Sequence, residues 1–586
     1  MSDAESQLVS DLLERYARAL EHGSQSEQLV ECHNTLRLAD AALDKVSLNA
    51  EHPAHPTQIV ILGPTQAGKS TLCNLLLDTD VAGISALAGF TVHAQGFATI
   101  QNPAALAPLE TLMQPHIRVQ AHELDNNNLN QYLLHSVSTG EHCLVQHAVV
   151  WDTPDFDSIE SSGYRSAVLQ AAAIADVLIL MVSKDKYADK TVWDMLHLVR
   201  RLGKPLLVCI NKLDEQDEET VVQSFQRRHT EQFNDDAPNI IALPFVGKNK
   251  GTNRDATVSM DARSVSNLNT FIDQASSQVN RSSHAEFVQG FIAHHLTHWM
   301  APINLEQDSL NDWQQTVDSA IANAKQLYSS RYLDNPKKYD TFNKAIAELL
   351  TLLEIPGLAG TLTRTRKLVT WPARKLLGIG KHAVNRQLPP PDQELEVLEL
   401  TLEQTLTSVQ GHILSEQQNT PDAVVFWSSL QSEFSNSKDG LREAYLTRAK
   451  QLQSEFEPRI DEAAKKLYEQ LQDQPALLNT LRAARVSADA AAVVLAVKSG
   501  GLAAADLIIA PAMLSVTTLL TESVLGQYME REKNSLKAEQ QALTNEQLIE
   551  QTLATWLYSL PDRLNNQQLL LAGHEPLPSS RNNSLN

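Results

Sequence analysis

The sequence has little cysteine and no long apolar run, and each shortage excludes a class of protein. Its four cysteines are scattered, without a CxxC motif or paired spacing, so we expect reduced, mostly buried thiols in a reducing compartment. No stretch reaches about 18 uncharged apolar residues, so a conventional membrane-spanning helix is not expected. Residues 1–20 contain early acidic side chains and no long apolar core, unlike a secretory signal. These features together predict a cytoplasmic protein.

Positive charge is also scarce. The chain has 48 Lys and Arg residues against 70 Asp and Glu residues, which gives a formal net charge of -22. A field of this sign repels phosphate backbones, so nucleic acid is not an expected partner, although a local basic patch stays compatible with the composition. His294 and His298 share a helix face but lack the intervening Glu of an HExxH site, so we expect no metal site there.

The length of 586 residues predicts at least two domains. Residues 1–50 carry apolar side chains at three-to-four spacing, which predicts N-terminal helices. The segment 49–58 then interrupts the pattern with two prolines and is expected to be a linker.

Between residues 57 and 280 the pattern changes to short apolar runs that alternate with helical stretches. Continuous Val, Ile and Leu runs are typical of strands buried on both faces. The runs are QIVIL (58–62), GFATI (96–100), HAVVWD (147–152), DVLILMV (176–182), PLLVCI (205–210) and NIIAL (239–243). They predict an α/β three-layer domain with a mostly parallel sheet. From 285 to 575 only helical spacing follows, so we expect a long all-α region, with a disordered polar tail at 576–586.

The stretch GPTQAGKST directly follows the first apolar run and opens a predicted helix. It satisfies the G-x-x-x-x-G-K-[ST] pattern, in which glycines let backbone N–H groups surround phosphates. Lys69 would place a charge on the outer phosphates, Ser70 would place a hydroxyl on Mg²⁺, and the helix N-terminus adds partial positive charge. The alternative is a plain glycine turn. The predicted nucleotide-binding loop comprises Gly63, Pro64, Thr65, Gln66, Ala67, Gly68, Lys69, Ser70 and Thr71.

The tetrapeptide NKLD, residues 211–214, indicates which base is bound. It ends an apolar run, and ligands of open α/β sheets bind at the carboxyl ends of strands. The Asp214 carboxylate can accept hydrogen bonds from the N–H and amino group of guanine, a donor pair that adenine lacks. Asn211 and the stem of Lys212 would brace the loop and cover the ring. A lone NKxD could be a surface turn, but behind a phosphate loop it predicts GTP.

In their order, these motifs resemble the G domain of translation-factor-class P-loop GTPases over residues 57–280. The resemblance implies GTP as substrate and Mg²⁺ as cofactor. In WDTPDFDS, Asp152 matches the aspartate that holds Mg²⁺ through water. Thr91 is the candidate switch threonine for Mg²⁺ and the γ-phosphate, with Thr99 as a rival inside a strand. Three residues stand where the family has the Ser-Ala-Lys of its guanine loop: Val246, Gly247 and Lys248.

Two positions depart from the family pattern. Asp155 replaces the glycine of DxxG, and it adds a carboxylate that repels phosphate unless a cation binds it. Phe156 stands where many small GTPases have a water-orienting glutamine. Hydrolysis then needs another group, a partner or a dimer, and Gln66 occupies a loop position from which dynamin-like GTPases use a side chain. Asp155 and Asp157 are lesser candidates for this role, and the alternative for Gln66 is a solvated loop residue. We therefore expect Lys69, Gln66 and Thr91 to be the catalytic residues, and slow turnover that rises on self-association.

The helical half contains two unusual segments. Residues 355–391 carry seven Lys or Arg and no Asp or Glu, with apolar and basic side chains on opposite faces. This segment would suit an anionic membrane surface, or else pack on the acidic body of the protein. Residues 486–526 read as an apolar helical hairpin, either buried in the bundle or dipping into a leaflet.

The overall layout resembles dynamin-like and related bacterial membrane GTPases, which join a G domain to a helical stalk with an apolar tip. This resemblance implies a GTPase whose helical domain acts at a membrane, with peripheral membrane contact in the cytoplasm. Three alternatives stay open: a soluble switch that binds a protein partner, a ribosome- or RNA-associated GTPase, and a protein that binds GTP without turnover.

Overall fold

The structure is a computed structural model that divides into two compact units. The first unit comprises residues 1–304 and 567–586, and the second comprises residues 305–566. Placement is described for residues 3–23, 26–83, 91–125, 127–157, 161–213, 216–244, 262–277, 279–353, 392–483, 517–564 and 566–571.

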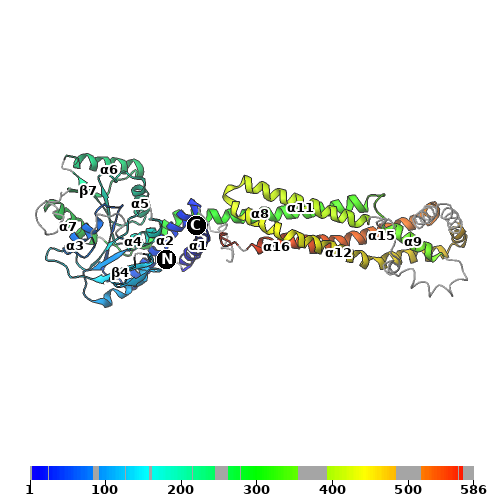
Figure 1. The fold of residues 1–586 in the computed structure, drawn as a ribbon, viewed down its shortest axis with the longest axis horizontal. Helices are drawn as coiled ribbons and strands as arrows, with labels where there is room; N and C mark the ends of the chain where they lie inside the picture. The colour runs from blue at the N-terminus through cyan, green and yellow to red at the C-terminus, as the bar shows by residue number, and fades with distance from the viewer. Residues whose placement is uncertain are drawn as a thin grey trace, which may run out of the picture. The chain divides into compact units, whose positions relative to one another are not determined.

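An eight-stranded sheet forms the centre of the first unit (Figure 1). Its strands are β1 (Thr57–Leu62), β2 (Gln95–Ala98), β3 (Ile117–Val119), β4 (Gln131–Ser136), β5 (Ala148–Asp152), β6 (Val177–Ser183), β7 (Leu206–Leu213) and β8 (Asn239–Pro244). They lie in the order β3-β4-β2-β5-β1-β6-β7-β8. All neighbours are parallel except β2 and β5, which are antiparallel. The predicted mostly parallel sheet is therefore confirmed.

Helices cover both faces of this sheet. They are α1 (Asp3–Glu21), α2 (Glu27–Glu51), α3 (Lys69–Leu77), α4 (Ser161–Ile174), α5 (Lys190–Arg200), α6 (Glu218–Phe233) and α7 (Ala262–Ser277). In β1, Val60 and Leu62 join the core formed with α1, α2, α4 and α5, whereas Ile59 and Ile61 join the core formed with α3 and α7. Because each face of β1 is buried, its sequence is continuously apolar rather than alternating.

The two N-terminal helices are an integral part of the first unit. α2 packs on α4. The Tyr16 hydroxyl donates to the Trp299 carbonyl at 2.6 Å, and the Trp299 indole N–H donates to Thr35 Oγ1 at 2.7 Å. The segment 567–571 also returns here, since the Arg18 guanidinium donates to the Leu569 carbonyl at 2.8 Å. Residues 1–50, expected from the sequence as a separate helical segment, thus share their core with the sheet.

The described residues of the second unit form helices joined by turns, with no strand among them, as predicted. It contains the later part of α8 (His284–Tyr328), then α9 (Thr341–Leu352), α11 (Gln393–Asn419), α12 (Val424–Gln472), α15 (Gly526–Leu543) and α16 (Thr555–Ser559), with π-helical segments at Ser329–Leu333 and Thr544–Ala554. The long helix α12 packs against α9, α11 and α15 (Figure 1). Large side chains such as Trp313, Trp427 and Tyr445 fill the space between these helices.

Several sequence expectations fall outside the described residues. These are the whole basic segment 355–391, residues 486–516 of the apolar hairpin, and the tail 576–586. Among the helices that are described, none combines the length and the apolar character needed to cross a membrane.

Candidate functional site

The loop between β1 and α3 has the backbone that the glycine pattern predicts. Gly68 has a φ of 103°, and a Cβ at this position would lie 2.5 Å from the Asn211 side-chain nitrogen. A Cβ on Gly63 would lie 2.3 Å from the Met181 carbonyl oxygen, in the neighbouring strand β6. Since β1 lies between β5 and β6, the loop occupies the carboxyl edge of the sheet centre, where α/β folds bind ligands.

Lys69 is buried at the start of α3 and pairs with a carboxylate. Its Nζ donates to the Gly63 carbonyl at 3.1 Å and the Pro64 carbonyl at 3.3 Å, and it forms an ion pair with Asp155. Asp155 is the residue that replaces the family glycine. The extra carboxylate expected from the sequence is therefore bound to a cation, and that cation is the lysine predicted to meet the phosphates.

Ser70 and Asp152 lie together beside this pair. The Ser70 hydroxyl donates to Asp152 Oδ2 at 2.6 Å. Asp152 Oδ1 is buried and has no hydrogen-bond partner among the described residues. Burial raises the pKa of Asp152 to about 6, although Lys69 and Ser70 act in the opposite direction. Mg²⁺ prefers oxygen ligands such as a carboxylate oxygen and a neighbouring hydroxyl oxygen. Asp152 Oδ1 and the Ser70 hydroxyl are ligands of this kind, so the residues present fit this ion.

The antiparallel pairing of β2 with β5 separates the two candidate switch threonines. Gln95, the first residue of β2, pairs with Asp152, whereas Thr99 follows the other end of β2 and its N–H donates to the Ala148 carbonyl at 2.9 Å. Thr99 is therefore bonded at the far end of β5 from Asp152. Thr91 is half-buried and precedes β2 on the Asp152 side in the chain, and its role as a Mg²⁺ ligand stays a prediction.

A brace that the sequence did not indicate holds the phosphate loop. Asp157 Oδ1 accepts from the Thr65 backbone N–H at 2.6 Å and from the Thr65 hydroxyl at 2.8 Å. Its other oxygen forms an ion pair with Lys186. Burial raises the pKa of Asp157, but the hydrogen bonds from Lys186 and Thr65 outweigh it and lower the pKa below the usual range. Asp157 is thereby committed to the loop as an anion.

The NKLD motif also reaches the phosphate loop. The Asn211 side-chain amide donates to the Ala67 carbonyl at 3.0 Å, and its oxygen accepts from the Lys212 backbone N–H at 2.8 Å. Lys212 has a φ of 62°, a left-handed conformation that falls at the irregularity in the pairing of β7 with β8 between Ile210 and Leu213. Asp214 and the predicted guanine loop, residues 246–248, lie outside the described residues, so their contacts with a base stay predictions.

Phe156 and Gln66 differ in exposure. Phe156 is buried and belongs to the core formed with α2 and α4. Its ring therefore serves packing, which accounts for an apolar residue at this position. Gln66 is exposed, with a φ of 59°, on the phosphate loop itself. Its participation in hydrolysis stays a prediction.

Comparison with known proteins identifies the domain type. A family model described as 50S ribosome-binding GTPase matches residues 58–212, from β1 into NKLD, so this part of the chain is a P-loop GTPase domain. The chain is also similar to a solved structure of an oligomerised bacterial dynamin pair, with 12% identity, 98% of this chain and 96% of that chain covered, and a TM-score of 0.36. It is also similar to the solved structure of LeoA, a bacterial dynamin GTPase from ETEC. The identity is 11%, 95% of this chain and 98% of that chain are covered, and the TM-score is 0.24. No curated protein sequence matches the chain significantly.

Proposed function

We propose that this protein binds GTP with Mg²⁺ in the loop 63–71 and hydrolyses it to GDP and phosphate. The observation that carries the proposal is the gathering of Lys69, Ser70 and Asp152 at the carboxyl edge of the central strands, within the GTPase domain. Catalysis of phosphoryl transfer is mostly positioning and charge neutralisation. Lys69 and the loop amides would offset charge on the outer phosphates. Ser70, Thr91 and Asp152 would hold Mg²⁺, which would supply further charge neutralisation when bound.

Guanine is the proposed base, and translation-factor-class GTPases are the proposed class. What supports this is that Asn211, three positions before Asp214 in the motif NKLD, donates to the Ala67 carbonyl of the phosphate loop. Asp214 would accept two hydrogen bonds from guanine, and a site built for such donors rejects analogues that lack them. We therefore expect a strong preference for GTP over ATP.

Calorimetry and phosphate release test this proposal on the full chain. GTP should bind at least about a hundredfold more tightly than ATP. Lys69→Ala should lower both GTP affinity and phosphate release by at least about a hundredfold, because a buried charge on the phosphates is lost. The matched control is Lys190→Ala, at an exposed lysine that begins α5, and it should leave both unchanged. Equal affinity for GTP and ATP would overturn the guanine assignment.

We further propose that the nucleotide state alters the helical region and that this region works at a membrane surface. What supports this is the segment 355–391, with seven Lys or Arg and no acidic residue in a chain of net charge -22. Each basic residue near an anionic surface contributes about 1 kcal/mol. Co-sedimentation with anionic liposomes should be strong, and Arg374→Gln combined with Lys375→Gln should reduce it about tenfold. Unchanged sedimentation of this variant would instead favour a soluble switch that binds a protein partner.

A further inference from the structure

A second charged pocket lies in the first unit at the opposite edge of the sheet from the phosphate loop. It has a volume of about 350 Å³ and is lined in part by Asp176, Lys204, Asn280, Arg281, Ser283 and His284. Asp176 directly precedes β6, and it accepts from the backbone N–H of Gln58 near the start of β1. The phosphate loop follows the far end of β1. A six-residue strand separates the two sites by roughly 20 Å.

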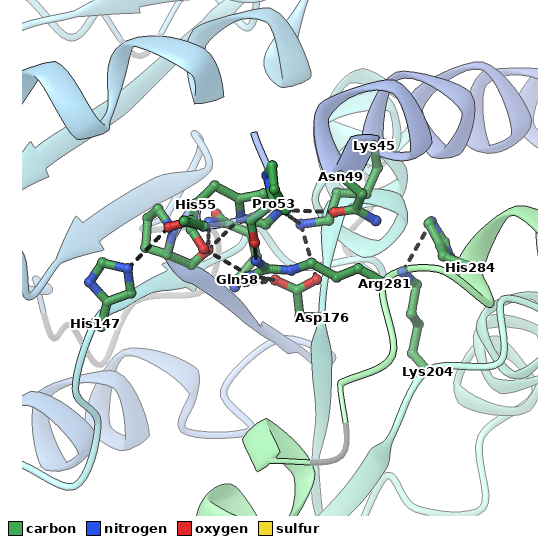
Figure 2. Close-up of polar contacts among 12 residues, drawn as sticks. Lys45, Asn49, Pro53, His55, Gln58, His147, Asp176, Lys204, Arg281 and His284 are labelled. Carbon is green, nitrogen blue, oxygen red and sulfur yellow. Dashed lines mark hydrogen bonds and ion pairs between the residues drawn. The ribbon is translucent and has the colours of Figure 1, made fainter. Parts of the chain in front are cut away.

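Cations outnumber carboxylates in this cluster (Figure 2). Lys45 is fully buried, with its Nζ 3.1 Å from Asp176 Oδ1. The Arg281 guanidinium lies 3.6 Å from Asp176 Oδ2 and also donates to the His55 carbonyl at 2.8 Å. Lys204 is the third cation. Among the described residues of the cluster, Asp176 is the single carboxylate that faces these three cations.

Two of the three cations retain unused donors. Lys204 is half-buried and donates to His284 Nε2 at 3.1 Å, with no carboxylate at ion-pair distance among the described residues. The Nε–H of Arg281 is buried and has no hydrogen-bond partner in the described part of the chain. The pocket thus presents hydrogen-bond donors that carry positive charge.

Keeping these groups charged costs free energy. Burial, and next the charge of Lys45, lower the pKa of Lys204 to about 7 despite the opposing effect of Asp176. Burial lowers the pKa of Lys45 itself to about 8. Burial and the charge of Lys204 lower the pKa of His284 to about 3, so this ring is neutral and can accept from Lys204. An anion in the pocket would relieve the repulsion among the cations.

A helix terminus adds to the positive potential of the pocket. Ser283 and His284 line it, and His284 is the first residue of the 45-residue helix α8. The N-terminus of a long helix carries partial positive charge and unpaired N–H groups that favour anions. The volume is at the lower end of the range found for small-molecule sites.

We propose that this pocket binds a small phosphorylated anion, whose phosphate oxygens are held by Lys204 and Arg281 at the start of α8. The excess of two cations over the single carboxylate matches the two charges of a phosphate monoester. Asp176 holds Lys45 and Arg281 in place, and the anion can bind without breaking these ion pairs. The site is separate from the GTP site and does not depend on GTP hydrolysis.

Inorganic phosphate is the probe, titrated by calorimetry into the full chain at constant ionic strength. Lys69→Ala serves as the parent, so that the phosphate loop does not contribute. We expect saturable binding to this parent. Adding Lys204→Met should weaken binding about tenfold or more, because a charge-assisted hydrogen bond is lost. Adding Lys190→Met, at the exposed lysine that begins α5, should leave it unchanged. No binding to the parent, or equal binding to the Lys204→Met protein, overturns the proposal.

Thermal melting gives a second readout that reports folding at the same time. Without phosphate, Lys204→Met should melt at a higher temperature than the parent, because a desolvated cation next to Lys45 is removed. With phosphate, only the parent and the Lys190→Met control should gain stability. A Lys204→Met protein that melts lower and still gains stability from phosphate contradicts a binding role for Lys204.

The pH dependence of anion affinity tests the proposal without any substitution in the pocket. Sulfate is the probe because it stays a dianion between pH 6 and pH 8.5. Lys204 loses its proton over this range, and Lys45, with a pKa of about 8, loses its proton toward the upper end, while Asp176 stays charged and His55 and His284 stay neutral. Sulfate affinity should therefore fall at least about fivefold from pH 6 to pH 8.5. Affinity that stays constant or rises over this range overturns the proposal.

Discussion

At the residue scale, the ion pair between Lys69 and Asp155 decides how nucleotide meets the phosphate loop. The lysine that would neutralise phosphates is held by a buried carboxylate of its own chain. Incoming phosphates must compete with Asp155 for this cation, and an unpaired buried carboxylate is costly. We therefore expect Asp155 to compete with the nucleotide for Lys69.

Asp155→Asn should bind GTP about tenfold more tightly, since a neutral amide neither holds Lys69 as strongly nor repels phosphate. The free energy of unfolding without nucleotide should fall, because Lys69 loses its charge partner. Titration calorimetry and thermal melting measure the two effects. The control is Asp157→Asn, which removes the Thr65 brace and should weaken GTP binding. Weaker GTP binding by Asp155→Asn would show that the carboxylate assists the bound state instead.

Asp152 should make Mg²⁺ binding depend on pH. Its pKa of about 6 means that protons compete with Mg²⁺ for the carboxylate in the acidic range. The Mg²⁺ affinity of the GDP-bound protein should be about fourfold lower at pH 5.5 than at pH 7.5. In Asp152→Asn this dependence should disappear. A Mg²⁺ affinity that does not change with pH would contradict ligation by Asp152.

The raised pKa of Asp152 makes folding stability depend on pH in the opposite direction to Mg²⁺ affinity. A carboxyl whose folded pKa is raised favours the folded state at low pH, and this contribution is lost as pH rises through about 6. Stability from Asp152 therefore falls with rising pH while Mg²⁺ affinity rises. The two measurements distinguish metal ligation from a general effect on the fold.

At the scale of elements, a buried carboxylate joins the helices of the second unit. Glu394, in the first turn of α11, accepts from the Tyr328 hydroxyl of α8 at 2.8 Å and from the Gln540 amide of α15 at 2.7 Å. The Gln453 amide of α12 also donates to it at 3.1 Å. Four helices therefore meet at one side chain, which fixes their register because shifted packing would leave these donors unpaired.

Glu394→Ala should lower the free energy of unfolding of the helical unit by about 3 kcal/mol, because two buried donors and one part-buried donor lose their acceptor. Calorimetric melting measures the loss, and the matched control is Glu399→Ala at an exposed position of the same helix. Burial raises the pKa of Glu394, so its contribution to stability declines as pH rises through the folded pKa. Equal losses for the two variants would contradict the role of this junction.

At the scale of the whole molecule, one helix supplies core residues to both units. Phe291 and Trp299 of α8 are buried in the first unit, and Trp313 and Val317 of the same helix are buried in the second. The 45-residue helix α8 therefore begins in the first unit and ends in the second. We expect this helix to carry a change of nucleotide state to the helical region.

Turnover per molecule should rise several-fold as protein concentration increases from about 0.1 to 20 μM. Phe156 is buried in the core and cannot orient water, so a second copy or Gln66 has to complete the site. Gln66→Ala should lower turnover at least about tenfold with GTP affinity unchanged. Phosphate release with light scattering measures both activity and assembly. A constant turnover per molecule would contradict activation by self-association.

The sequence by itself determined the class of fold and the position of the phosphate loop. Strands buried on two faces must be continuously apolar, and a loop that surrounds phosphates needs glycine, so both leave local patterns in the chain. β3 escaped prediction because it has only three residues, with Ile117 exposed, and β4 escaped because polar residues stand at both of its ends. The N-terminal helices were visible, but not their packing on α4.

Only the tertiary structure decided which charges meet. Lys69 and Asp155 are 86 positions apart, Thr65 and Asp157 are 92 positions apart, and Asp176 lies between Lys45 and Arg281 in the chain. No periodicity or spacing encodes such pairs, since they depend on the order of strands in the sheet. Burial then sets the pKa of each group, and burial is a property of the packed chain rather than of a residue type.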